Sequence, residues 1–346
     1  RTAASSSPAA ARADGTAKYR VHRYFLHTAM KNKIKIIYED NHLLVCEKPV
    51  NMPVQADSSG DEDLLSTVKA YIKEKYSKPG EVYLGLVHRL GRPVGGVMVF
   101  ARTSKAAARL TESFKNRKTK KRYAAIVSGS PCSSAELECD LLRDEQNNIS
   151  RVVRPNTPGA KAASLEYVST VTKNGFTLLD VLLHTGRHHQ IRAQLAWSGC
   201  PIFGDQRYNR AARVGQQIAL YAYSLTIEHP TLRESMTFTC IPHGAKFDEF
   251  SDECAALVAG VRCAYIDNNL ICVNKSSGIS CTVEDGGNDT LEARLNSAFG
   301  KVYPLHRLDA PTSGLVLFAR NAKTAAVLGE AIRQHKIKKF YQKAPL

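Results

Sequence analysis

Short apolar runs bounded by turn residues recur along the chain, and each is typical of a β-strand. Six of them are clear: 42–48, 94–102, 122–129, 175–183, 269–275 and 313–320. Between them, residues 103–117 carry Ala107, Leu110 and Phe114 at helical spacing behind a capping Thr or Ser, which predicts an amphipathic helix. Residues 175–199 predict a strand, a glycine turn and a helix ended by Gly199. This mixture predicts an α+β fold with a mostly antiparallel central sheet flanked by helices.

An internal repeat organises the chain. Residues 88–123 align without a gap with 306–341, and 17 of the 36 positions are identical. Upstream, residues 38–54 match 265–281 in the same order. Similarity at this level indicates a duplication. The first copy continues for more than a hundred residues past Tyr123, whereas the chain ends five residues after the matching Tyr341, inside an expected strand.

The repeat sets the expected domain organisation. An N-terminal extension, 1–33, precedes a first, complete copy at 34–245, a linker at 246–262 and a partial second copy at 263–346. The first seventeen residues are rich in Ala, Ser and Arg and hold one acid, a composition typical of an organellar transit segment or its remnant. A disordered tail is the alternative.

Charge and cysteine usage narrow the function. The 48 Lys and Arg against 32 acids leave a formal net charge of +16, which favours a polyanionic partner. No apolar stretch is long enough to span a membrane. The nine cysteines form no CxxC pair and no HExxH is present, so we expect free thiols and no metal site.

Three sequence blocks carry a family resemblance. They are HRLDAPTSG at 306–314, the K-x-Y that follows it at 339–341, and TGRHHQIR…GCPIFGDQRY at 185–208. Together they resemble the RluA-type pseudouridine synthases, across about 34–225 in the first copy and from about 263 to the end in the second. The resemblance implies isomerisation of uridine to pseudouridine in RNA, with no metal or organic cofactor. It also implies an essential Asp after His-Arg-Leu that acts on a flipped-out nucleotide.

The first copy departs from that pattern at the essential position. The resemblance implies that Arg89 fills the gap left by the flipped base, that Tyr123 packs on the uracil, and that Arg192 pairs with the Asp. The Asp itself is replaced by Gly91, which can neither attack nor accept a proton. We therefore expect the first copy to be inactive. Without its partner, Arg192 would bind phosphate or pair elsewhere, and Tyr123 would be an ordinary core aromatic.

The second copy keeps the loop but lacks the third block. Asp309 stands in an intact HRLD loop beside Arg307, with Tyr341 behind it, yet no TGR-x-HQIR sequence follows. Asp309 is catalytic here only if the second copy is active, either through further sequence or through Arg192 of the first copy. In the first copy, Asp205 is expected to hold a turn, and His188 and His189 to begin a helix rather than bind metal.

A basic run lies beside the expected cleft. Six of the eight residues at 115–122 are Lys or Arg, and residues 333–339 form a similar basic run in the second copy. A solvated charged face is the ordinary explanation, but the position favours contact with RNA phosphates. The expected RNA-binding residues are Arg89, Lys115, Arg117, Lys118, Lys120, Lys121, Arg122, Tyr123, Arg187, Arg192, Arg307 and Tyr341.

The sequence leaves three functions open. The first is an inactive homologue that binds structured RNA, with ribosomal RNA or a ribosome precursor as partner and an assembly or RNA-chaperone role, in an organelle with the mitochondrion favoured. Ribosomal or assembly proteins are further expected partners. The second is an active isomerase that uses Asp309. The third is a protein-interaction module that no longer binds RNA.

Overall fold

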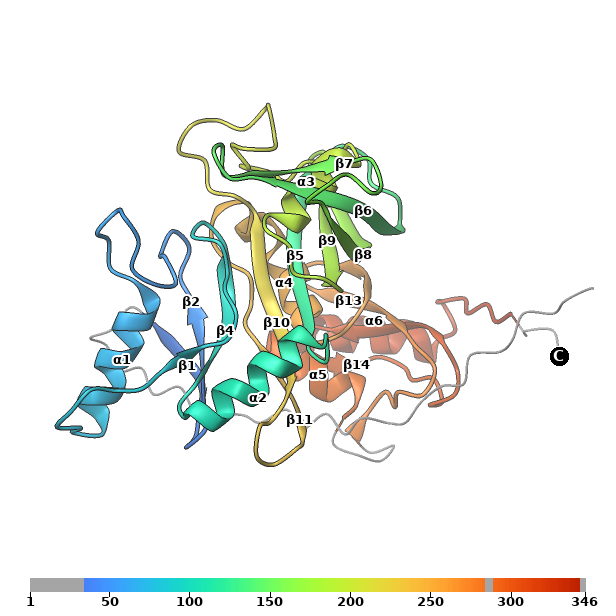
Figure 1. Cartoon of the computed structure of the whole chain (residues 1–346). Helices are drawn as coiled ribbons and strands as arrows, with labels where there is room; N and C mark the ends of the chain where they lie inside the picture. The colour runs from blue at the N-terminus through green and yellow to red at the C-terminus, as the bar shows by residue number, and fades with distance from the viewer. Residues whose placement is uncertain (1–33, 284–288, 343–346) are drawn as a thin grey trace, which may run out of the picture.

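The computed structural model describes residues 34–283 and 289–342, which form two β-sheets with helices packed on them (Figure 1). The expected N-terminal extension, 1–33, lies outside the described residues. The larger sheet belongs to the first copy and has eleven strands in the order β1-β2-β4-β10-β5-β9-β8-β6-β7, with β3 beside β4 and β11 beside β10. The strands are β1 (Lys35–Glu39), β2 (Leu43–Lys48), β3 (Gly85–Leu86), β4 (Gly95–Ala101), β5 (Lys120–Ser128), β6 (Ser134–Asp144), β7 (Ile149–Val153), β8 (Lys161–Lys173), β9 (Phe176–Leu183), β10 (Leu220–Glu228) and β11 (Ser235–Thr239).

Among the described strand pairs, β4–β10 alone is parallel, which confirms the predicted α+β fold with a mostly antiparallel sheet. A glycine makes that parallel contact possible. Gly96 has φ +128°, and a Cβ placed on it would lie 2.2 Å from the carbonyl oxygen of Ala222 on β10. Any side chain at residue 96 would therefore separate the two strands.

Three helices accompany the large sheet: α1 (Leu64–Lys75), α2 (Ser104–Lys115) and α3 (Gln190–Trp197). The predicted helix at 103–117 is confirmed as α2. The Thr103 side chain accepts a hydrogen bond from the backbone N–H of Ala106, as a capping residue does. Ala106 and Leu110 face the core and are almost fully buried, so α2 is fixed on the sheet beside the β3–β4 loop.

The smaller sheet repeats the first part of the larger one. Its order is β12-β13-β15-β14, with bounds β12 (Cys263–Ile266), β13 (Leu270–Lys275), β14 (Tyr303–Pro304) and β15 (Gly314–Ala319), and its helices are α5 (Leu291–Phe299) and α6 (Ala322–Arg333). Lys275 pairs with Gly314 as Lys48 pairs with Gly96. Both first hairpins also carry an irregularity at the same place. The two copies thus share strand order and register over this part.

The connection between the two sheets, predicted as a linker at 246–262, is helical over much of its length. A 3₁₀ helix, η1 (Ala245–Phe250), runs into α4 (Ser251–Val258), and Phe247 and Phe250 are buried in the core of the large sheet. Glu253 on α4 pairs with Lys173 of β8 at 2.6 Å, and Asp252 pairs with Arg320 of the second copy at 2.5 Å. The repeat carries no signal for this packing, because the segment lies between the two copies.

Candidate functional site

A buried lysine, Lys48, holds the β3–β4 loop, which contains the HRL sequence of the first copy. The Lys48 ammonium donates to the carbonyl oxygens of Pro49 and Met52 at 2.7 Å and of Arg92 at 3.0 Å. In the second copy, Lys275 donates to the carbonyl oxygens of Ala310 and Thr312. Our sequence reasoning gave these lysines no role, although their matching positions in the repeat were a usable signal.

His88 begins the same loop and is held as a neutral ring. Its Nε2 accepts the backbone N–H of Val99 at 3.0 Å, and its ring stacks on Phe114 of α2 with centroids 4.8 Å apart. Burial, with a smaller effect from the Lys121 charge, lowers the pKa of His88 to about 3. His306 accepts from Leu317 in the same way in the second copy. These histidines therefore position the two loops, and His88 carries no charge near neutral pH.

Gly91 and Asp309 occupy the same place in matching turns. The N–H of Val94 donates to the Gly91 carbonyl at 3.0 Å, and the N–H of Thr312 donates to the Asp309 carbonyl at 2.9 Å. A Cβ added to Gly91 would meet its nearest neighbours, on Pro93 and Val94, at 3.8 and 3.9 Å, which is ordinary contact. The backbone of the first copy thus has room for the missing side chain.

Lys121 lies where three sequence blocks meet. It stands in β5, its charge acts on His88 of the β3–β4 loop, and its Nζ lies 3.4 Å from the place a Cβ would take on Gly186 of the TGR turn. Burial and the nearby Arg117 charge lower the pKa of Lys121. In the second copy, Lys339 acts on His306 in the same manner. Lys121 therefore places a positive charge between the β3–β4 loop and the TGR turn of the first copy.

Tyr123 and Tyr341 have different surroundings. Tyr123 is half-buried between the two apolar clusters of the first copy, and burial raises its pKa to about 12. Tyr341 is 70% exposed, and residues 338–342 form no strand, in contrast to the strand expected there. The described part of the second copy has no neighbouring strands in this position, so nothing holds Tyr341 over the Asp309 loop.

Arg192 forms its ion pair with Asp205, not with a residue of the β3–β4 loop. Its guanidinium donates twice to Asp205, at 2.8 and 2.6 Å, with the two side chains 8% and 0% exposed. Asp205 also accepts the backbone N–H groups of Arg207 and Tyr208, as expected for a turn-holding residue. With Gly91 in the loop, Arg192 pairs elsewhere, and its burial argues against the phosphate contact that the sequence left open.

The TGR turn before α3 is rigid. The Gln190 side-chain oxygen accepts from the Thr185 hydroxyl and from the Arg187 backbone, and its amide donates to Ser164 of β8. The Arg187 Nε donates to the carbonyl of Ala162 at 3.0 Å, which leaves this half-buried guanidinium beside the cleft. His189 caps the start of α3 in a left-handed conformation, in line with the predicted helix-start role.

The basic run divides into an exposed part and an internal part. Arg122 donates to Asp180 and to the Tyr223 hydroxyl, so it belongs to the fold rather than to a free surface. Lys121 is partly buried, as described above. Four residues are exposed and are named here the exposed quartet: Lys115, Arg117, Lys118 and Lys120. Arg89 in the β3–β4 loop and Arg307 in the matching loop of the second copy are also exposed, so both loops carry exposed positive charge.

The described residues contain neither a candidate metal-binding cluster nor a candidate membrane-spanning helix. No cluster of three or more His, Cys, Asp or Glu side chains within 34–283 and 289–342 could hold a metal ion. Over the same ranges, no helix is long and apolar enough to cross a bilayer.

Comparison with known proteins decides the family. The family model for RNA pseudouridylate synthase matches residues 42–197 and 269–344. The chain belongs to this family. Both matched segments contain a loop that begins with His-Arg-Leu, one with Gly91 and one with Asp309.

Relatives of this pseudouridylate synthase family member agree with the assignment. Ribosomal large subunit pseudouridine synthase D of Zymomonas mobilis is 31% identical over 216 residues, which cover 59% of this chain and 68% of that protein. An uncharacterized RNA pseudouridine synthase of Aquifex aeolicus is 34% identical over 220 residues, with the same coverage. The solved structure of human RNA Pseudouridylate Synthase Domain Containing 4 superposes with a TM-score of 0.52 at 25% identity, covering 63% of this chain and 92% of that one.

Proposed function

We propose that residues 34–245 form a catalytically inactive pseudouridylate synthase domain that binds structured RNA, followed by a partial second copy at 263–346. The observation that carries this proposal is Gly91, which stands in the turn position that Asp309 occupies in the second copy. A carboxylate is the group that the family resemblance makes essential, and glycine supplies no side chain for nucleophilic or acid–base chemistry.

Retained RNA binding rests on the positive edge of the cleft. The exposed quartet lies at the end of α2 and the start of β5, and Lys121 and Arg187 flank the TGR turn. Within the described residues, the Lys121 ammonium has no acidic partner. Cations placed in this way bind phosphates without choosing a sequence, and structured RNA offers phosphates on a defined surface.

Ribosomal RNA or a ribosome precursor is the proposed client. Several relatives are named ribosomal large subunit pseudouridine synthases, including those of Zymomonas mobilis and Vibrio parahaemolyticus. A homologue that binds such RNA without modifying it would act as an assembly factor or RNA chaperone, in contact with ribosomal or assembly proteins. The Ala-, Ser- and Arg-rich start of the chain supports an organelle, with the mitochondrion favoured.

The test is tritium release from RNA labelled at C5 of uracil, because isomerisation exchanges that hydrogen. We expect no release from the native chain, together with tight, salt-sensitive binding of the same RNA. Release that survives Asp309→Ala would overturn the claim that the first copy is inactive.

The alternative function is an isomerase that uses Asp309. The intact loop and its lysine anchor, Lys275, favour it. An isomerase needs a pocket around its catalytic Asp. In the described residues Asp309 and Tyr341 are both exposed, so they do not form such a pocket. Release from the native chain that disappears in Asp309→Ala would select this alternative.

A further inference from the structure

A second cationic feature lies apart from the cleft, in the loop between α3 and β10. Residues 204–217 close at their base, because a Cβ on Gly204 would lie 2.2 Å from the Gln217 carbonyl oxygen. Within the loop, the Gln206 amide donates to the Gln216 carbonyl at 3.1 Å, and the Gln216 side-chain oxygen accepts the backbone N–H of Arg213 at 3.1 Å. The loop is therefore a closed, internally bonded unit.

The charge of this loop is unbalanced. Arg207, Arg210 and Arg213 are exposed, and the single acid of the loop, Asp205, is buried against Arg192. Arg207 also donates to the Asn147 carbonyl in the β6–β7 turn, which ties the loop to that hairpin. Three exposed guanidinium groups on one ordered loop form a surface that attracts phosphates.

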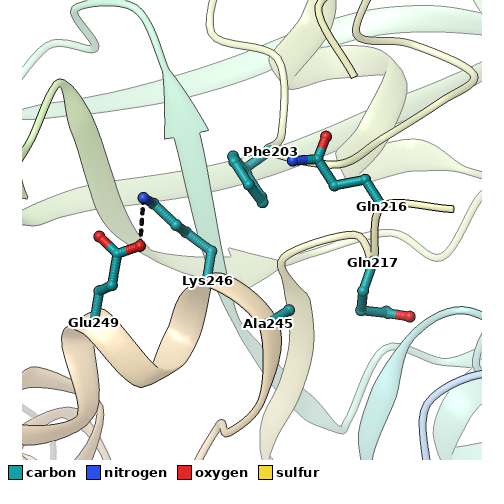
Figure 2. Close-up of a pocket in the computed structure, with 6 residues that line it drawn as sticks. All are labelled: Phe203, Gln216, Gln217, Ala245, Lys246 and Glu249. Carbon is teal, nitrogen blue, oxygen red and sulfur yellow. Dashed lines mark hydrogen bonds and ion pairs between the residues drawn. The ribbon is translucent and has the colours of Figure 1, made fainter. Parts of the chain in front are cut away.

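A hollow of about 340 Å³ adjoins the loop (Figure 2). Its wall includes the half-buried ring of Phe203, with the side chain of Gln216 directed toward it from the loop. On the other side, the Lys246 ammonium binds Glu249 at 2.6 Å and lies 5.4 Å from the Phe203 ring centroid. An aromatic ring, a carboxamide, an ammonium and a carboxylate thus surround one space.

We propose that this hollow takes one unstacked base of single-stranded RNA, while Arg210 and Arg213 hold the adjoining phosphates. An aromatic surface beside a positive groove is the combination that binds single-stranded nucleic acid. The carboxamide and carboxylate offer hydrogen bonds to the edge of a base. A peptide would use the aromatic ring but would gain nothing from the arginines unless it were acidic.

The hollow touches the β3–β4 loop of the proposed function at one point, because Gln217, which lines it, donates to the Pro93 carbonyl at 2.6 Å. Its aromatic wall lies further along β5. Phe203 bonds to Ile126 in β5, with its N–H donating to the Ile126 carbonyl at 2.8 Å. Ile126 is five residues along β5 from Lys121, a separation of roughly 16 Å at strand rise. The proposal takes RNA as its ligand from the proposed function, but it concerns different residues and single strands rather than structured RNA.

The experiment measures binding of fluorescein-labelled eight-nucleotide RNAs to the full chain by anisotropy. One RNA carries all its bases, and its partner has abasic sites with the same phosphates. We expect the complete RNA to bind more tightly by roughly 5-fold to 100-fold, the range for stacking of one base on an aromatic ring. Phe203→Leu should remove that difference, and Phe203→Tyr should keep it.

Matched variants separate charge from stacking. Arg210→Gln with Arg213→Gln should weaken the binding of both RNAs by the same factor. The control, Lys73→Gln with Lys78→Gln, removes the same exposed charge on and after α1 and should leave the binding of both RNAs unchanged. Equal binding of the complete and abasic RNAs would overturn the base site. If the Phe203→Leu variant does not fold, Gln216→Ala replaces it and must reduce the difference in affinity between the complete and the abasic RNA. Loss of structured-RNA binding on neutralising the exposed quartet tests the proposed function independently.

Discussion

The buried pair between Arg192 and Asp205 should dominate the stability of the first copy, and Asp205→Asn tests this. The substitution keeps the size of the side chain but removes its charge, leaving the buried Arg192 guanidinium without a counter-ion. Both side chains are almost fully buried and joined by hydrogen bonds of 2.8 and 2.6 Å. Breaking a buried pair from one side costs about 3–5 kcal/mol.

We expect the lower part of that range. An asparagine oxygen can still accept the N–H groups of Arg207 and Tyr208, which donate to Oδ1 in the native chain. A loss of about 3 kcal/mol lowers Tm by roughly 6–12 °C in a domain of this size. Neutralising both partners, as Arg192→Met with Asp205→Asn, should be less destabilising than Asp205→Asn alone, because no charge is then left buried and the Asn oxygen still accepts the two N–H groups.

The assay is thermal and urea unfolding followed by circular dichroism. The matched control is Glu330→Gln, which breaks the exposed pair with Arg333 on α6 and should leave the midpoint unchanged within error. A loss below about 1 kcal/mol in Asp205→Asn, the ordinary effect of a point substitution, would refute the structural role given to Arg192. It would then return Arg192 to the candidates for RNA contact.

Three further predictions concern the cleft. Gly91→Asp should fold with a free energy of unfolding within about 1 kcal/mol of the native value, because the added Cβ meets only ordinary contacts; a larger loss in urea melts contradicts this. The folded pKa of His88 is about 3, against about 6.5 when unfolded, so the unfolded chain takes up the proton first. The free energy of unfolding should fall as pH drops from 6.5 toward 3, by up to about 1.4 kcal/mol per unit, and His88→Gln should flatten that part of the pH profile. Neutralising the exposed quartet should reduce the slope of log affinity against log salt by about 3.6 for double-stranded RNA, at about 0.9 for each of four phosphate contacts; equal slopes for the quartet variant and the native chain would contradict this. Arg122→Gln should instead lower Tm through its lost bond to Asp180.

Local signals in the sequence predicted the elements well. The Thr103 cap and the apolar spacing of Ala107, Leu110 and Phe114 are short-range features, and α2 forms where they indicate. The repeat likewise predicted that two loops would share a turn, and Gly91 and Asp309 do so. Each of these features depends on residues close together in the chain.

Long-range partners could not be predicted in the same way. Arg192 has an acid thirteen residues away in Asp205, yet the family resemblance pointed to the Asp position of a distant loop. The parallel contact of Gly96 with Ala222 joins residues more than a hundred positions apart. The buried Lys48 reads as a surface lysine in the sequence, because its three acceptors are backbone carbonyls that carry no sequence signature.

The two neighbouring acids of α4 have a mechanical consequence. Glu253 forms an ion pair with Lys173 of the first copy, and Asp252 forms one with Arg320 of the second. One turn of α4 is therefore linked to both sheets. These two ion pairs therefore restrict the relative movement of the two copies, and with it the separation between the basic run at 115–122 and its counterpart at 333–339. An RNA that contacts both basic runs must present phosphates at a matching spacing. Binding at two points then increases affinity only for RNAs whose geometry allows both contacts at once.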